Sequence, residues 1–291
     1  MRQIALLDAP SNLGLRPPLQ GAVPGCYKAP GVLRDAGLLE RLGAREAGVV
    51  TAARYLPDWT PGIVRNEAAI AEHGLLLADR VGALLDGGRT PVVLGGDCSI
   101  LVGLALALKR RGRYGLVSLD GLDYRHPGNS DNVGAAGGES LAMVTGLGGP
   151  LADLGGLGPS LRTEDVVAIG FRPDDECAEE AAAAGMHLID ATAAVADPAA
   201  AVARALDVVA RQELDGFWIH CDADVLDPAE LAAVDSPEPG GLGFEHLGAL
   251  VSGLVASPRF AGLDLTIYDP DLDPGLVGGR RLADLLVQAL L

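Results

Sequence analysis

The segment Phe217–Pro228 reads FWIHCDADVLDP and changes from apolar to acidic within a few residues. Its first half is typical of a strand that is buried on both faces, as in a parallel sheet. Within that strand we expect at least one of His220 and Cys221 to be a core residue. Ligands of open α/β sheets bind at the carboxyl ends of the strands, where clustered carboxylates suit a cation. We therefore expect half of a metal site here.

The composition is that of a globular protein. The chain has 291 residues, and 49% of them are hydrophobic, which is enough material for a large buried core. Its net charge of −17 argues against a nucleic-acid or anionic-membrane surface, because both need clustered Lys and Arg. The four cysteines form no Cys-x-x-Cys pair, so we expect free thiols in a reducing cytoplasm. We also expect neither a signal peptide nor a membrane span.

Strand and helix patterns alternate along the chain. Apolar strands are predicted at 3–8, 48–50, 91–94, 115–119, 165–170, 186–189, 216–221 and 260–266. Helices are predicted at 32–43, 62–85, 99–110, 138–146, 175–185, 192–212, 244–255 and 276–290. This alternation implies right-handed crossovers and a mostly parallel sheet that is covered by helices on both faces. No linker divides residues 1–291, so we predict a single α/β domain.

Two other predicted strands also end in polar residues. Leu94–Ser99 reads LGGDCS, and Val117–Asp123 reads VSLDGLD. Taken alone, Gly-Gly-Asp is more often a turn whose Asp caps the next helix, and a lone pair of aspartates is usually a solvated loop. The carboxyl ends of parallel strands lie at one edge of a sheet, however. The coincidence of several such ends therefore favours one shared site.

Together these segments resemble the motifs of the arginase/agmatinase/formimidoylglutamase family, the ureohydrolases. Gly95–Ser99 resembles its Gly-Gly-Asp-His-Ser motif, and Asp120–Asp123 resembles its Asp-Ala-His-x-Asp motif. Asp222–Pro228 closely matches its Asp-x-Asp-x-x-Asp-Pro motif. The resemblance covers nearly the whole chain and implies a three-layer α/β/α sandwich around a mostly parallel sheet. It also implies a homo-oligomer, either a trimer or a hexamer.

In that family the motifs hold two manganese ions, which convert a bridging water into hydroxide that attacks a guanidinium or amidine carbon. The resemblance therefore implies one or two Mn²⁺ ions and a small-molecule guanidino or amidino substrate. It implies hydrolysis of a non-peptide carbon–nitrogen bond. The metal ligands that it implies are Asp120, Asp123, Asp222, Asp224 and Cys98.

The chain departs from the family pattern in four places. Cys98 stands where the family has a metal-binding His; a thiolate there favours a softer ion, and a small buried residue without a ligand role is the alternative. The second motif is one residue short and contains no His, so both imidazole ligands of the family are absent. Gly137–Leu141 occupies the region in which arginases carry a proton-shuttling His. Ile267 stands where arginases and agmatinases place the Glu that pairs with the guanidinium.

Other residues offer substitutes for those that are missing. Asp123 or His126 would handle protons, and His126 is also a possible ligand, although a loop His is more often simply exposed. Glu238 or Glu139 would replace the carboxylate that binds the substrate cation. Each of these four roles is a prediction from the sequence and the resemblance.

Two alternative functions stay open. A catalytically impaired family member would keep the fold and a partial metal site for a binding or structural role. A phosphatase would use Asp222 as nucleophile and Asp224 as acid, but it would also need a Lys at the same sheet edge. Lys28 and Lys109 are the only lysines, and neither falls at a predicted strand end. The sequence therefore disfavours the phosphatase.

Overall fold

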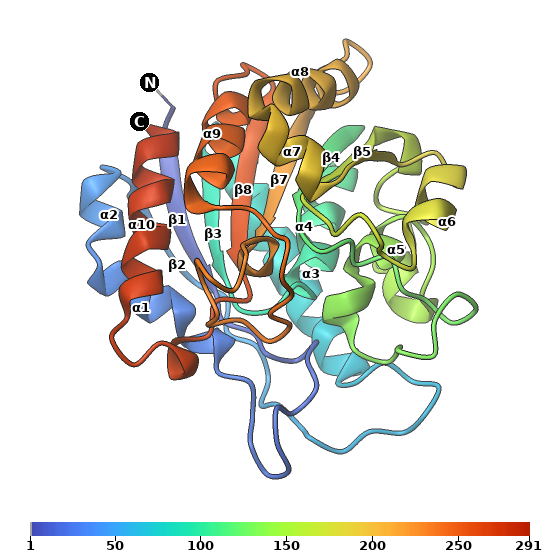
Figure 1. Ribbon diagram of the computed structural model, residues 1–291. Helices are drawn as coiled ribbons and strands as arrows, with labels where there is room; N and C mark the ends of the chain where they lie inside the picture. Colours follow the sequence, from blue (N-terminus) through green and yellow to red (C-terminus); the bar gives the residue numbers. More distant parts are fainter. Residues whose placement is uncertain (1) are drawn as a thin grey trace.

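The computed structural model describes residues 2–291 and contains one eight-stranded sheet between two layers of helices (Figure 1). The strands lie in the order β2-β1-β3-β8-β7-β4-β5-β6, and each neighbouring pair is parallel. This confirms the predicted α/β sandwich, with a sheet that is parallel throughout. The strands are β1 (Ile4–Ala9), β2 (Arg45–Val49), β3 (Thr90–Gly95), β4 (Tyr114–Leu119), β5 (Val166–Ile169), β6 (His187–Ile189), β7 (Gly216–Asp222) and β8 (Phe260–Thr266).

The helices follow the strands in near-regular alternation. They are α1 (Ala29–Asp35), α2 (Leu38–Arg41), α3 (Glu67–Asp86), α4 (Ile100–Lys109), α5 (Ser140–Val144), α6 (Ala178–Ala183), α7 (Ala191–Ala196), α8 (Pro198–Val209), α9 (Phe244–Val255) and α10 (Val277–Leu290). Short 3₁₀ turns lie at Cys26–Lys28, Ala136–Glu139, Gly149–Asp153, Thr163–Asp165, Ala223–Val225 and Pro270–Leu272. Among the described residues, no helix is both long and apolar enough to span a membrane.

Two predicted helices are each divided in two. The helix expected at 32–43 stops at Asp35, because Gly37 adopts a left-handed conformation with a φ of 80°, and α2 begins after it. The helix expected at 192–212 breaks at Asp197, which precedes Pro198 and has an extended φ of −153°. A residue before proline is disfavoured in the helical region, so α8 starts afresh with its own Asp cap. The helix expected at 138–146 is only the short α5, preceded by a 3₁₀ turn.

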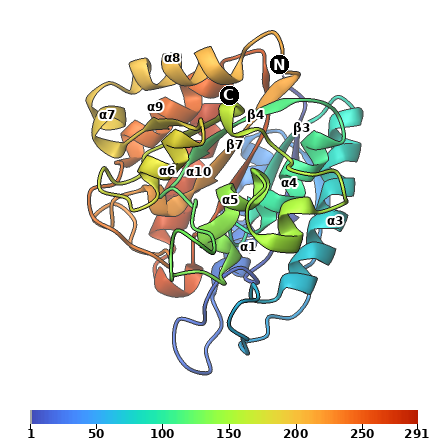
Figure 2. The same ribbon diagram turned by 90° about the vertical axis from the view of Figure 1, so that its right-hand side faces the viewer.

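The sheet separates two hydrophobic cores, and Figure 2 shows α3 and α4 on the opposite side of it from α8 and α9. One lies under α3, α4 and α5, and the other lies under α1, α8, α9 and α10. Alternate residues of a strand face opposite sides, and β7 follows this rule. Trp218 packs into the core beside α4, whereas Phe217 and Ile219 pack into the other core. Even-numbered residues of β7 therefore face the core beside α4, and odd-numbered residues face the other core.

The loop after β3 is held tightly against the loop after β1. The backbone N–H of Asp97 donates to the carbonyl of Ser11 over 3.1 Å, and the Ser11 hydroxyl donates to Asp97 Oδ2 over 2.7 Å. Gly96 lies at the closest approach, where a Cβ atom would lie 1.8 Å from the Ser11 carbonyl oxygen. This contact needs a glycine and sets the position of Cys98, two residues further on.

Replacing Gly96 with Ala should destabilise the protein, because the added methyl group would meet backbone that cannot swing aside. Overpacking of this kind costs about 1–3 kcal/mol of unfolding free energy. Gly248→Ala is the matched control, since nothing lies within 4 Å of its added Cβ. Alanine there should stabilise α9 by about 1 kcal/mol. Denaturant unfolding of both variants measures the difference, and wild-type stability in Gly96→Ala would contradict the packing described.

Candidate metal centre

Three neighbouring strands place polar side chains in a row across the sheet. Parallel pairing puts Ser118 of β4, His220 of β7 and Asp264 of β8 side by side. His220 lies two residues after Trp218, so it faces the same side of the sheet, whereas Cys221 packs into the opposite core. All these side chains are buried. The row therefore forms a polar floor beneath the carboxyl end of the sheet.

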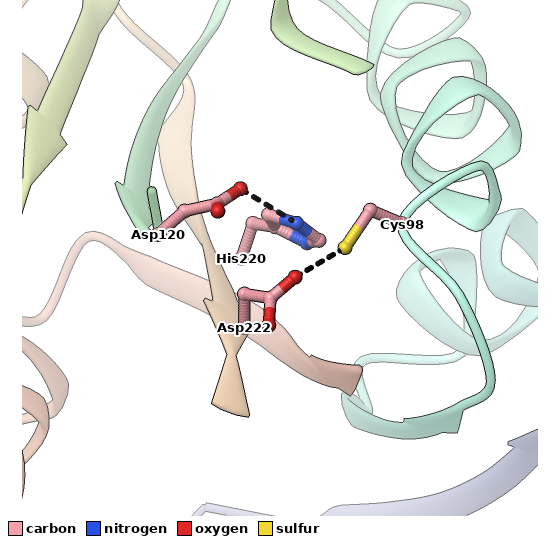
Figure 3. Close-up of side chains that lie close together, drawn as sticks. All are labelled: Cys98, Asp120, His220 and Asp222. Carbon is pink, nitrogen blue, oxygen red and sulfur yellow. Dashed lines mark hydrogen bonds and ion pairs between the residues drawn. The ribbon is translucent and has the colours of Figure 1, made fainter. Parts of the chain in front are cut away.

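A second set of side chains lies above this floor. Asp222 pairs with Thr266 two residues further along the strands than the pair of His220 and Asp264. Asp120 follows the end of β4, and Cys98 reaches in from the loop after β3. Figure 3 shows Cys98, Asp120 and Asp222 grouped around His220. One potential ligand atom from each of these four residues lies within 4.8 Å of the others. We call these four residues the metal cluster.

The imidazole of His220 is fixed from one side and unpartnered on the other. Its Nδ1 lies 2.6 Å from Asp264 Oδ2, and the indole N–H of Trp218 donates to Asp264 Oδ1, also over 2.6 Å. Its Nε2 points to Asp120 Oδ2 at 3.6 Å, which is too long for a hydrogen bond. Neither of these two buried atoms has a hydrogen-bond partner among residues 2–291. Such atoms are expected around a site that takes a ligand.

Cys98 and Asp222 are in direct contact. The thiol donates to Asp222 Oδ2 over 2.6 Å and lies 3.2 Å from Thr266 Oγ1. The other oxygen of Asp222 accepts from the backbone N–H of Asp224 over 2.8 Å. Burial, with the charges of Asp222 and Asp120, raises the pKa of Cys98 well above its ordinary value. Without a cation, the sulfur therefore keeps its proton.

The metal cluster opens into a cavity of about 140 Å³. Cys98 and Asp222 line this cavity, whereas His220 and Asp120 are buried and do not line it. Asp123 and Asp224 line the same cavity, and Asp224 Oδ1 is buried without a hydrogen-bond partner among the described residues. The predicted ligands from the ends of β3, β4 and β7 are thus brought together.

The crowded carboxylates perturb one another. Burial raises the pKa of Asp222 well above its ordinary value, and the neighbouring charges of Asp224 and Asp120 add to this shift. The pKa values of Asp224 and Asp123 are raised for the same reasons. Burial opposes a charged imidazole at His220, but Asp264 and Asp120 overcome this effect and raise its pKa. A divalent cation would relieve the repulsion between the carboxylates.

The donor set fits a divalent cation. Carboxylates, an imidazole and a thiol are all metal ligands, and the unpartnered atoms of His220 and Asp120 face each other across the cluster. Asp123 and Asp224 add carboxylates at the cavity wall. These residues are able to hold one ion in the cluster, and the cavity-wall pair offers ligands for a second.

The other residues predicted for the site lie at different distances from it. Glu238 lines the cavity. His126 does not line it, because its Nε2 lies 2.9 Å from Glu180 Oε1 on α6. Glu139 is buried outside the cavity, where it accepts from the backbone N–H groups of Gly134 and Ala135. The roles predicted for these three residues stay predictions.

Some residues of the site are not evident from the sequence alone. The sequence predicts that at least one of His220 and Cys221 is a core residue; both are buried, and His220 is also the imidazole of the cluster. A signal was present, because the period of two places His220 and Asp222 on one face of a strand. Arg172 also lines the cavity, where its guanidinium donates to the carbonyls of Asp224 and Glu238. Asp235 lines the same cavity from the loop after β7.

Ile267 follows the end of β8 and lines the cavity, so the cavity wall has an apolar side chain at this position. Its φ is 70°, which is a rare conformation for a β-branched residue. The backbone N–H of Ile267 donates to the Gly96 carbonyl over 2.7 Å and holds this conformation. The end of β8 is thereby tied to the loop that carries Cys98.

Comparison with known proteins gives consistent matches along the chain. A model of the Arginase family matches residues 3–291. The arginase of Bacillus caldovelox is 27% identical over 288 residues, which cover 94% of this chain and 93% of that protein. The arginase of Brevibacillus brevis is 29% identical over 267 residues, or 86% of each chain. The solved structure of the Bacillus caldovelox arginase has a TM-score of 0.89 and 25% identity, covering 100% of this chain and 98% of that one.

The metal-free protein should lose stability as pH rises. Asp123, Asp222 and Asp224 keep protons in the folded state above the ordinary pKa of 3.8, and His220 does so above 6.5. The folded protein then binds more protons than the unfolded chain, so its free energy of unfolding falls as pH rises from about 4 through the folded pKa values. A saturating divalent ion should remove this decline.

Thermal unfolding across this pH range, with chelator or with added metal, measures the effect. Asp224→Asn removes one raised carboxylate and should flatten the curve obtained with chelator. A metal-free protein whose stability rises steadily between about pH 4 and 8 would contradict the assignment.

Proposed function

Because the chain belongs to the Arginase family, we propose that it is a metal-dependent hydrolase acting on a non-peptide carbon–nitrogen bond of a guanidino or amidino compound. The observation that carries this proposal is the buried metal cluster opening onto an acidic cavity. Family membership alone would support the reaction class. The cluster supports it in this chain, because two family ligands are missing and a different imidazole lies among the carboxylates.

A bound divalent ion would supply Lewis-acid activation of water beside the substrate carbon. Asp120 and Asp222 would hold the ion, and Asp264 would orient His220 towards it. Manganese is the ion that the resemblance implies, and the carboxylates of Asp123 and Asp224 suit it because they are hard ligands. We propose one or two ions per chain.

We propose Asp123 as the group that moves a proton at the reacting nitrogen. It lines the cavity, and the Ser140 hydroxyl donates to its Oδ2 over 3.3 Å. Burial and the charges of Asp120 and Asp224 raise its pKa, which brings the carboxyl group closer to the range that a proton carrier needs. His126 remains a predicted second carrier, and it would first have to leave Glu180.

The electrostatics of the cavity support a cationic substrate. Its lining includes six carboxylates and only two guanidinium groups, those of Arg125 and Arg172. We propose that Glu238 faces the cation, with Glu139 as the alternative from the sequence. A second cavity of about 500 Å³ shares part of this lining and has an apolar wall that includes Pro17 and Val23. It offers space for the body of the substrate beyond its cationic head.

The oligomeric state and the cellular location are also proposed from family membership. We propose a homo-oligomer, a trimer or a hexamer, that works in the cytoplasm. The four cysteines are buried free thiols, which agrees with a reducing environment.

A role in binding without turnover is the second candidate. The observation that favours it is Ile267, because an apolar side chain at the cavity wall cannot balance a guanidinium charge. In this case the fold and the metal cluster would be kept for binding or assembly.

Metal-loaded protein should release urea or ammonia from at least one member of a panel of guanidino, amidino and formimino compounds. Asp224→Asn should lower that rate by more than about tenfold, because it removes a cavity-wall ligand. Asp79→Asn is the control, since Asp79 lies on α3 in an exposed ion pair with Arg110. Colorimetric assays for both products measure the rates. If protein shown to hold metal releases neither product from any compound of the panel, the result would favour binding without turnover.

A further inference from the structure

We propose that the metal cluster is a site for a single borderline-soft ion of the zinc class, with His220 and Cys98 as ligands. The proposal rests on the same site as the proposed hydrolase, but it concerns which ion binds and which residues hold it. Hard ions such as manganese would be left to the carboxylates of Asp123 and Asp224.

The first argument comes from the second nitrogen of His220. A metal-binding histidine almost always gives its other ring N–H to a carboxylate or carbonyl, which fixes the ring and raises its basicity. His220 has this partner in Asp264, at 2.6 Å from Nδ1, and Trp218 fixes the carboxylate in turn. The remaining Nε2 is fully buried and has no hydrogen-bond partner among the described residues. It points into the cluster.

The second argument is geometric. Four ligands about 2.0–2.3 Å from a central zinc lie roughly 3.3–3.8 Å from one another in a tetrahedron. In the cluster, His220 Nε2 lies 3.6 Å from Asp120 Oδ2, and Cys98 Sγ lies 2.6 Å from Asp222 Oδ2. All four ligand atoms lie within 4.8 Å of one another. The separation of His220 and Asp120 already falls in the tetrahedral range, whereas Cys98 and Asp222 would move apart on binding the ion.

The third argument is the chemistry of the donors. One thiolate, one imidazole and two carboxylates form a mixed set that zinc accepts in four-coordinate sites. Manganese prefers carboxylate, carbonyl and water oxygens, and a thiolate selects against it. The Cys98 thiol must lose its proton when the ion binds. The S–H bond breaks, a sulfur–metal bond forms, and the proton now shared with Asp222 leaves through the cavity that both residues line.

The two sets of carboxylates therefore differ in kind. Asp120 and Asp222 lie with sulfur and nitrogen donors in a fully buried cluster. Asp123 and Asp224 lie at the cavity wall without such partners. A soft and a hard ion should consequently separate between the cluster and the wall, which gives the proposal a measurable signature.

Cobalt(II) titration of the chelator-treated full-length protein tests the ligands directly. A thiolate ligand gives a sulfur-to-cobalt charge-transfer band, and four-coordinate geometry gives intense visible bands. We expect both in the wild type. Cys98→Ser should lose the charge-transfer band, and Cys221→Ala should keep it, because Cys221 is equally buried but lies outside the metal cluster, on the face of β7 opposite to that of His220. His220→Gln should weaken cobalt binding by about tenfold or more.

Competition between zinc and manganese tests the selectivity. The ratio of the two affinities should fall by about tenfold or more in Cys98→Ser, mainly through weaker zinc binding. The proposal is overturned if the wild type shows no charge-transfer band, or if Cys98→Ser keeps both the band and the ratio. If Cys98→Ser does not fold, unchanged cobalt binding in His220→Gln overturns it instead. None of these measurements needs a substrate, so a protein without turnover can still pass them, and an active enzyme can fail them.

Discussion

The carboxylate of Asp264 is the buried charge on which the site depends. A buried carboxylate is costly unless its oxygens are hydrogen-bonded, and both oxygens here are used, one by Trp218 and one by His220. These contacts join β8 to β7 across the centre of the sheet. They also determine which nitrogen of His220 is left over and where it points. The orientation of the imidazole therefore follows from the need to satisfy one charge in the core.

The same low-dielectric environment disfavours the ionised forms of the acids near the carboxyl end of the sheet. Asp123, Asp222 and Asp224 each have a raised pKa, so burial and mutual repulsion disfavour their ionised forms. A site arranged in this way is less stable when empty at neutral pH than an apolar core would be. Residues that lower stability in this manner are typical of functional sites. These three aspartates, together with Asp120, are best explained by a cation that they would share.

The sequence predicted the fold well and the site in part, for physical reasons. The position of Asp222 and Asp224 at a shared cavity was predictable, because the carboxyl ends of parallel strands meet at one edge of a sheet. His220 was not, because its role depends on Asp264, which is distant in the chain and adjacent only through the register of β7 and β8. The division of two helices at Gly37 and Pro198 follows local backbone rules that apolar periodicity does not reveal. The sequence likewise does not predict the orientation of loop residues such as His126.

Two of the four departures from the family pattern, Cys98 and Ile267, are neighbours in the structure. Thr266 contacts the sulfur of Cys98, and the next residue, Ile267, donates its backbone N–H to the Gly96 carbonyl. The loop that carries Cys98 and the strand end that carries Ile267 are thus in direct contact. A different ion at Cys98 and a different substrate charge at Ile267 would therefore affect the same region of the structure. With His220 as a ligand, as we propose, one member of the metal cluster would be held by the sheet itself, through Asp264 and the register of β7 and β8.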